Sequence, residues 1–146
     1  MSEEHGGFVG RISIGADIVE IERFRFLESN APFIRKVFSE REQEYCCSYS
    51  TPAPHFATTF AGKEAVVKAI GDRSSVMIQD VEIVRENDGR PEVRFREDIP
   101  LSVIVSLSHS QNYAVAVAIA CPRVPHSEEE GLRKLLNGVI SQIQPE

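Results

Sequence analysis

The chain has 146 residues, of which 42% are hydrophobic and 26% are charged, and its formal net charge at pH 7 is −6. Such values are typical of one globular domain with its own core, and the acidic balance argues against a general nucleic-acid binder. No apolar run reaches the length of a membrane span, and the first residues, MSEEHGG, lack the hydrophobic core of a secretory signal. We therefore expect a cytoplasmic protein without a membrane span and without a nucleic-acid partner.

Three cysteines, Cys46, Cys47 and Cys121, occur without a CxxC spacing and without a histidine at zinc-ligand spacing. Adjacent cysteines such as Cys46 and Cys47 are poorly placed to form a disulfide with each other. We therefore expect buried or half-buried thiols in a reducing compartment.

The first half of the chain is predicted to contain a leader (1–7), a strand and several helices. The strand is indicated by alternating apolar residues that share one face: Ile12, Ile14, Ala16 and Ile18. Segment 20–47 is expected to form two helical pieces, because Pro32 is suited to open the second or break the first, and SERE (39–42) is typical of a further helical start. The next segment, TPAPHF, is predicted to be a loop.

The segment 56–71, FATTFAGKEAVVKAIG, is predicted to be an amphipathic helix that is capped by Thr58 or Thr59 and ends at Gly71. One face is suited to close packing and holds Ala61, Gly62, Ala65, Val66, Ala69 and Ile70. The other face carries the charged residues Lys63, Glu64 and Lys68. The charges alone favour a solvated face with an acid–base pair at i, i+4, unless the fold brings a second carboxylate close to them.

The second half of the chain has a β pattern with two predicted hairpins. The first spans 76–95 around the turn signal Asn87-Asp88-Gly89, and the second spans 101–120 around the turn SHSQN. A strand, then helices, then an antiparallel meander is the order of an α+β fold. We expect this fold to occupy one domain at 8–121.

Residues 122–146 are predicted to form a helical extension that begins near Ser127. Its apolar residues recur with a helical period: Leu132, Leu135, Leu136, Val139, Ile140 and Ile143. The acidic first turn argues against a membrane-surface helix. We expect the extension to pack on its own domain or on a neighbouring subunit.

Three segments, ISIGADIVEIERF, FAGKEAVVKAIG and SLSHSQNYAVAVAIA, carry a resemblance to a known family. They match a Gly-x-Asp strand end followed by I-x-E-I-x-R, a helix with F-A-x-K-E-A-x-x-K-A, and a late S-x-S-H-S/T turn. From about residue 9 to residue 120, the chain resembles the holo-acyl-carrier-protein synthases, the small single-domain branch of the 4′-phosphopantetheinyl transferase superfamily. The resemblance implies that family's α+β fold and Mg²⁺-dependent transfer of phosphopantetheine from coenzyme A to a serine of an acyl carrier protein, which releases 3′,5′-ADP.

The resemblance also implies roles for individual residues. Asp17 and Glu64 would hold Mg²⁺, while Glu64 and Lys68 would be the catalytic side chains. Coenzyme A would be bound by Lys63, Lys68, His109 and Ser110. The chemistry is consistent, because Mg²⁺ takes one or two protein carboxylates and fills its other positions with phosphate oxygens and water.

The same family forms trimers with active sites between subunits, and we expect a homotrimer here. The carrier protein would dock on the first helical segment through Arg23, Leu27 and Arg35, because an acidic carrier requires a local basic surface on an acidic chain. In the alternative interpretation, the phenylalanines interleaved with these arginines belong to the core and the arginines are merely solvated.

Two departures from the family pattern leave a second function open. Thr59 stands where the family usually has a basic residue, and the Gly-Thr-Gly loop after the helix is replaced by GDRSS (71–75), in which Arg73 could compensate in part. These changes favour a catalytically impaired, carrier-binding subunit. A third interpretation is a structural α+β module, which would leave the three matching segments unexplained.

Overall fold

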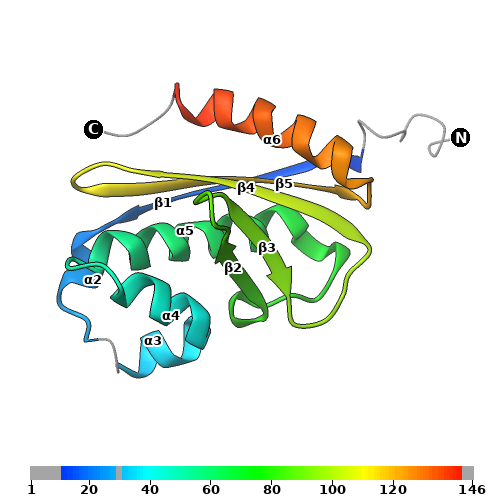
Figure 1. The fold of residues 1–146 in the computed structure, drawn as a ribbon. Coiled ribbons are helices and arrows are strands. Elements are labelled where there is room, and N and C mark those ends of the chain that lie inside the picture. Colours follow the sequence, from blue (N-terminus) through cyan, green and yellow to red (C-terminus); the bar gives the residue numbers. More distant parts are fainter. Residues whose placement is uncertain (1–10, 29–30, 143–146) are drawn as a thin grey trace, which may run out of the picture.

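The computed structural model describes residues 11–28 and 31–142, and its elements follow the predicted order (Figure 1). They are β1 (Ser13–Glu20), α2 (Glu22–Arg25), α3 (Pro32–Val37), α4 (Glu40–Cys47), α5 (Ala53–Ile70), β2 (Val81–Arg85), β3 (Pro91–Phe95), β4 (Leu101–His109), β5 (Tyr113–Pro122) and α6 (His126–Ile140), with short 3-10 turns at Gly71–Arg73 and Ile78–Asp80. The α+β prediction is confirmed. The predicted leader lies outside the described residues, and the predicted domain boundaries stay predictions.

The strands form two antiparallel sheets instead of one continuous meander. The larger sheet has the order β1-β5-β4, and the smaller is the β2–β3 hairpin, which turns at Gly89 with φ 86°. Helix α5 covers one face of the larger sheet and α6 the other, while α2, α3 and α4 lie beyond α5 (Figure 1).

Strand β5 shows why the larger sheet is sandwiched between helices. Its alanines, Ala114, Ala116, Ala118 and Ala120, belong to the core that includes α5. The larger side chains that alternate with them, Val115, Val117 and Ile119, pack with Leu136 and Ile140 of α6. Successive side chains of a strand point to opposite faces, so a strand that is apolar at every position is buried on both.

Gly15 sets the contact between β1 and α5. A Cβ atom at this position would lie 2.1 Å from the carbonyl oxygen of Ala65 and 2.6 Å from the backbone nitrogen of Ala69. Only glycine permits so close an approach of strand and helix. The contact places the residue two positions later, Asp17, beside the turn of α5 that carries Lys68.

The helical region differs from the prediction in two places. Segment 20–47 forms three helices instead of two pieces, although Pro32 opens α3 as predicted and a capping box between Ser39 and Glu42 confirms the predicted further start at α4. Helix α5 begins at Ala53 instead of near Thr58, so the predicted TPAPHF loop is wrong. The N–H groups of a first helical turn need no partner within the helix, so Pro54 is tolerated there.

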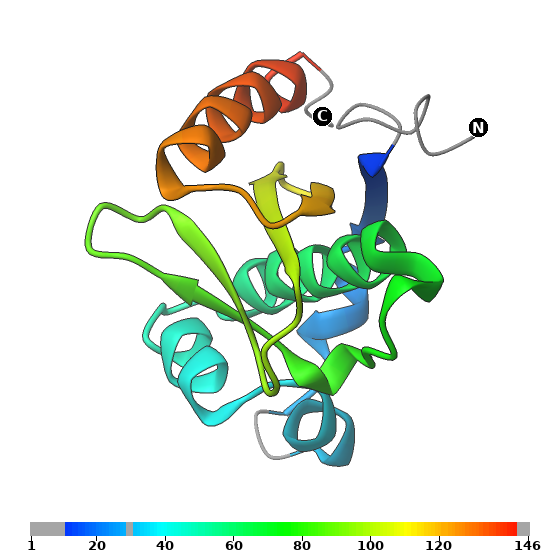
Figure 2. The same ribbon diagram turned by 90° about the vertical axis from the view of Figure 1, so that its right-hand side faces the viewer.

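Helix α6 confirms the predicted C-terminal helix, although it starts at His126 and Ile143 lies outside the described residues. It packs on β4 and β5 and leaves β1 to one side (Figure 2). Hydrogen bonds join Ser106 Oγ to Asn137 and Arg133 to the carbonyl of Pro91 in the hairpin. In the part of the chain that the structure describes, no helix is long and apolar enough to cross a bilayer.

The face of β1 that turns away from α5 is largely open. Ile14 and Ile18 are 65% and 61% exposed, and Leu135 and Val139 of α6 are exposed as well. An open apolar surface of this kind is typical of a contact with another chain.

The cysteine prediction holds for Cys46 and Cys121, which are buried, but not for Cys47, which is exposed. All three are free thiols.

Candidate functional site

Asp17 and Lys68 form the centre of the candidate site. Lys68 Nζ lies 2.9 Å from Asp17 Oδ1 and 3.1 Å from the carbonyl oxygen of Ala16. The Asp17 side chain is 16% exposed, whereas that of Lys68 is 52% exposed. The carboxylate is therefore held in place between β1 and α5, and the lysine side chain is accessible to a ligand from solvent.

Glu64 lies one helical turn before Lys68, on the same side of α5. It is half-buried, and it makes no hydrogen bond or ion pair with any of the described residues. Within residues 11–28 and 31–142, no cluster of three or more His, Cys, Asp or Glu side chains could hold a metal ion alone. A pair of carboxylates from two facing elements fits Mg²⁺, whose remaining ligands are usually phosphate oxygens and water.

A cavity of about 510 Å³ opens beside Lys68, at the end of α5. Arg73 lines it and donates to the carbonyl oxygens of Arg11 (2.7 Å) and Ala120 (3.0 Å), and to Ser13 Oγ. No described carboxylate lies within ion-pair distance of Arg73. The cavity is lined by the cationic residues Arg11, Lys68 and Arg73 and by Asp72, so a phosphate group that entered it would meet a net positive charge.

Lys63 does not lie in this site, which corrects its prediction as a coenzyme A ligand. Its side chain is 0% exposed, and its Nζ donates to Glu42 Oε1 and to the carbonyl of Val37, both at 2.7 Å. Glu42 also accepts the backbone N–H groups of Ile83 (2.8 Å) and Ser39 (2.9 Å). Burial lowers the pKa of Lys63, and the Glu42 carboxylate opposes that shift. The buried Lys63–Glu42 pair therefore links α5 to α4, and the Glu42 carboxylate also links α4 to β2.

Replacing Lys63 by methionine is expected to lower the free energy of unfolding by about 3–5 kcal/mol, because Glu42 would keep a buried charge without its counter-ion. Urea denaturation measures the loss. Lys36→Met, at an exposed position, is the matched control and should change stability by less than about 0.5 kcal/mol. Equal stability of the two variants would show that the buried pair has no structural role.

His109 and Ser110 lie near the first turn of α5, whereas Lys68 lies in its last turn. The His109 ring contacts the His55 ring at 5.9 Å, and His55 is stacked on Tyr49 at 3.6 Å. His55 opens α5 while Lys68 closes it, so thirteen residues of helix, or about 20 Å, separate the two ends. The predicted coenzyme A ligands of one chain therefore form two separate groups.

Arg85 adds a cation to the histidine group. Its guanidinium lies 4.7 Å from the Tyr45 ring centroid, with one nitrogen 3.4 Å from Thr59 Oγ1 and another buried without a partner among the described residues. Desolvation, together with the nearby charges of His109 and Arg85, lowers the pKa of His55. The sequence pattern did not indicate Tyr49, His55 or Arg85, because they come from three segments that only the fold brings together.

Comparison with known proteins decides the family. The family model described as the 4′-phosphopantetheinyl transferase superfamily matches residues 13–118, most of the chain. The chain belongs to this superfamily. It is therefore an enzyme of the phosphopantetheinyl transferase class, as the three matching segments predicted.

Individual relatives of this phosphopantetheinyl transferase agree with the assignment. The holo-[acyl-carrier-protein] synthases of Thermodesulfovibrio yellowstonii and Chlamydia caviae are 37% and 42% identical to it, over 73% of this chain and 95% and 93% of theirs. A crystal structure of the Bacillus anthracis holo-(acyl-carrier-protein) synthase in complex with CoA (3′,5′-ADP) superposes with a TM-score of 0.65 at 28% identity, covering 77% of this chain and 99% of that one. These matches confirm the predicted fold, while α6 lies beyond the residues that the family model matches.

The predicted docking segment of this phosphopantetheinyl transferase is divided between core and surface. Phe24 is buried, whereas Phe26 is 82% exposed. Arg23 is exposed, and its guanidinium lies 5.6 Å from the centroid of the Phe60 ring. Phe60 lies in α5, one helical turn before Glu64. Leu27 and Arg35 are exposed on the same segment. The basic and apolar surface of α2 and α3 therefore leads along α5 toward the candidate site.

Proposed function

We propose that this chain transfers 4′-phosphopantetheine from coenzyme A to a serine of an acyl carrier protein, with Mg²⁺ as cofactor and 3′,5′-ADP as the leaving product. The observation that carries the proposal is the meeting of Asp17 from β1 with the turn of α5 that carries Glu64 and Lys68. Membership of the superfamily and the names of the relatives give the reaction class.

Asp17 and Glu64 are the residues that would hold Mg²⁺. The Asp17 carboxylate is kept in place by β1 packing on α5, and its ion pair with the Lys68 ammonium at 2.9 Å supports a cation at this position. Bound there, Mg²⁺ would neutralise negative charge on the pyrophosphate of coenzyme A.

The transfer forms a bond between the serine oxygen of the carrier and the phosphorus that bears pantetheine. The bond from that phosphorus to the bridging oxygen breaks, the serine proton passes to solvent or base, and the electron pair leaves with 3′,5′-ADP. Lys68, with its exposed ammonium group, is suited to stabilise the charge that develops on the leaving phosphate. Arg73 lines the adjacent cavity and is held in place by hydrogen bonds to backbone carbonyl oxygens, so it would orient the same phosphates.

We propose a homotrimer in which the histidine group of one subunit completes the site of the next. The separation of His109 and Ser110 from Lys68 supports this, because neither group of a single chain holds all of the predicted coenzyme A ligands. The exposed apolar residues of β1 and α6 supply a surface for association. Sedimentation equilibrium should give about three times the 16.3 kDa of one chain; an active monomer would contradict the arrangement.

Arg23→Glu is expected to raise the KM for carrier protein by at least roughly tenfold, or about 1.4 kcal/mol, and to leave the KM for coenzyme A unchanged. Reversing the charge would repel an acidic carrier at the docking surface, and the effect should shrink as salt screens it. Steady-state kinetics at two ionic strengths measure both constants.

Arg96→Glu is the matched control, since it makes the same change in net charge at an exposed residue of the connection after β3. It should leave both KM values within about twofold of wild type. Equal increases for Arg23→Glu and Arg96→Glu would mean that net charge, and not the docking surface, governs carrier binding.

The function itself is tested by incubating the protein with coenzyme A, Mg²⁺ and an apo acyl carrier protein. A mass gain of one phosphopantetheine on the carrier identifies the transferase. Complex formation without a mass gain identifies a carrier-binding subunit, the alternative that the buried Thr59 and the altered 71–75 loop favour. Neither binding nor mass gain would leave only a structural module.

A further inference from the structure

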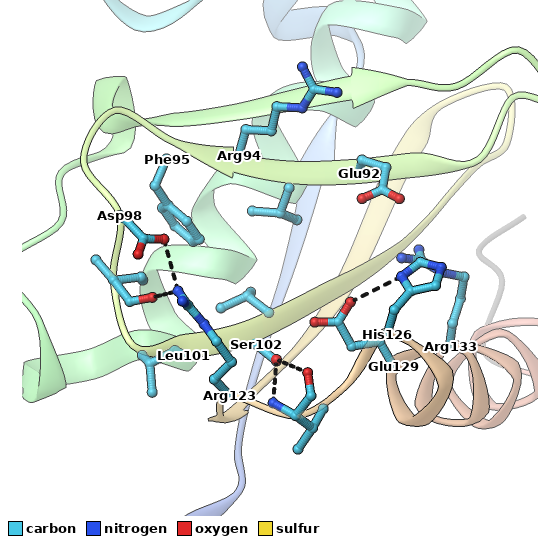
Figure 3. A pocket seen from close by; sticks show the side chains of 14 residues that line it. Glu92, Arg94, Phe95, Asp98, Leu101, Ser102, Arg123, His126, Glu129 and Arg133 are labelled. Carbon is cyan, nitrogen blue, oxygen red and sulfur yellow. Dashed lines mark hydrogen bonds and ion pairs between the residues drawn. The ribbon is translucent and has the colours of Figure 1, made fainter.

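A second cavity, also of about 510 Å³, lies between β3, the start of β4 and the first half of α6 (Figure 3). Its lining shares Leu101 with the cavity beside Lys68 but includes none of Asp17, Glu64, Lys68 and Arg73. One wall is α6, which lies beyond the part of the chain that the family model matches. The cavity is therefore built partly from the C-terminal extension of this chain.

Arg133 is the unusual residue of this cavity. It is only 6% exposed, and its side chain rises from α6 toward β3, where it donates to the carbonyl oxygen of Pro91 at 2.9 Å (Figure 3). Its Nε is buried without a hydrogen-bond partner, and no carboxylate of the described residues lies within 4.0 Å of its guanidinium. A buried cation is costly unless an anion pairs with it.

The other charged groups of the cavity are largely paired or solvated. Arg123 contacts Asp98 at 2.8 Å, and His126 lies 3.8 Å from Glu129. Glu92 projects from β3 and makes no ion pair with the described residues (Figure 3). Because Glu92 and Glu129 both border the space in front of Arg133, a doubly charged anion such as phosphate would be repelled more than a single carboxylate.

The rest of the lining consists of Arg94, Ser102 and six apolar side chains: Val93, Phe95, Ile99, Leu101, Val103 and Val124. Small-molecule sites combine apolar side chains with polar groups that fix the orientation of the ligand. The guanidinium matches a carboxylate, and the apolar lining matches a short hydrocarbon chain.

We propose that this cavity binds a small monocarboxylate with an apolar body, whose carboxylate pairs with Arg133 and whose body lies over Val93, Leu101 and Val103. Binding would supply the missing counter-ion of Arg133 and join α6 more firmly to β3. The proposal is independent of the transfer reaction, because it uses none of Asp17, Glu64, Lys68 and Arg73.

The test is an NMR titration of the full chain with hexanoate. The signal observed is the Nε–H resonance of Arg133, which is assigned as the resonance that disappears in Arg133→Lys. We expect a saturable shift of this resonance at millimolar to tens of millimolar hexanoate, the weak affinity expected of so small a ligand. Hexanamide, which has the same tail without the charge, should leave it unchanged. Sodium chloride at equal ionic strength controls for screening.

Two further arms complete the test. In Arg133→Met, the backbone resonances of Val93 and Val103 should no longer respond to hexanoate, whereas in Arg123→Gln, at an exposed cation of the same cavity, they should respond as in wild type. Inorganic phosphate should shift the Arg133 resonance less than hexanoate does. The proposal is overturned by an unmoved Arg133 resonance, by equal shifts with hexanamide, or by a larger shift with phosphate.

Discussion

Asp17→Asn and Glu64→Gln are each expected to lower kcat/KM for phosphopantetheine transfer by at least roughly a thousandfold, or about 4 kcal/mol of transition-state stabilisation. Each substitution keeps the shape of the side chain and removes one of two carboxylates that would share a metal ion. The double variant should be no worse than either single variant, since either loss empties the same site. Initial rates at saturating Mg²⁺ and coenzyme A measure all three.

Asp72→Asn is the matched control for these variants. Asp72 is an exposed carboxylate at the end of α5 and lines the cavity beside Lys68, but it lies outside the proposed pair. Its replacement should leave kcat/KM within about threefold of wild type. Near-normal turnover of Asp17→Asn or Glu64→Gln, with thermal unfolding unchanged, would remove these residues from the metal site.

The second large effect is expected from mixing inactive subunits. Chains with Asp17→Asn lack the metal end of the site, which is formed by Asp17 and Glu64. Chains with both His109→Ala and Ser110→Ala lack the other end, which is formed by the histidine group. Coexpression in equal amounts should restore about a quarter of the wild-type sites, because each end is intact in half of the chains and random assembly multiplies the two fractions. Transfer rates per chain measure the recovery.

The control for this experiment mixes Asp17→Asn with Glu64→Gln chains. Both changes affect the same end of the site, so no arrangement of these two chains forms an intact site. If the first mixture were as inactive as the second, both ends of the site would have to come from one chain, and the interfacial arrangement would be wrong.

The sequence predicts the elements that depend on local patterns. The capping box of Ser39 and Glu42, the hairpin turn at Gly89 and the apolar period of α6 all involve residues within a few positions of one another. Each signal reflects hydrogen bonding or periodicity within a single element. The position of Asp17 beside Lys68 followed only from the family resemblance, since 51 residues separate the two.

The features that the sequence did not indicate depend on contacts between distant segments. Nothing near Lys63 signals that its partner is Glu42, 21 residues earlier, and the lysine looked like part of a charged helix face. The stacking of His55 on Tyr49 and the buried position of Arg133 likewise arise only when several elements pack together. Helix periodicity shows which face of α6 is apolar, but not that it covers β4 and β5 and leaves β1 open.

Asp17 from β1 and Glu64 from α5 are proposed to hold a single divalent ion. Electron paramagnetic resonance of Mn²⁺, with coenzyme A present and carrier protein absent, measures that ion directly without turnover. We expect one bound Mn²⁺ per chain in wild type and in Asp72→Asn. In Asp17→Asn and Glu64→Gln, the Mn²⁺ affinity should fall at least about tenfold, because a loss of that size follows even the mutation of residues that only hydrogen-bond to metal ligands. Unchanged Mn²⁺ affinity in both of these variants would mean that neither carboxylate binds the ion.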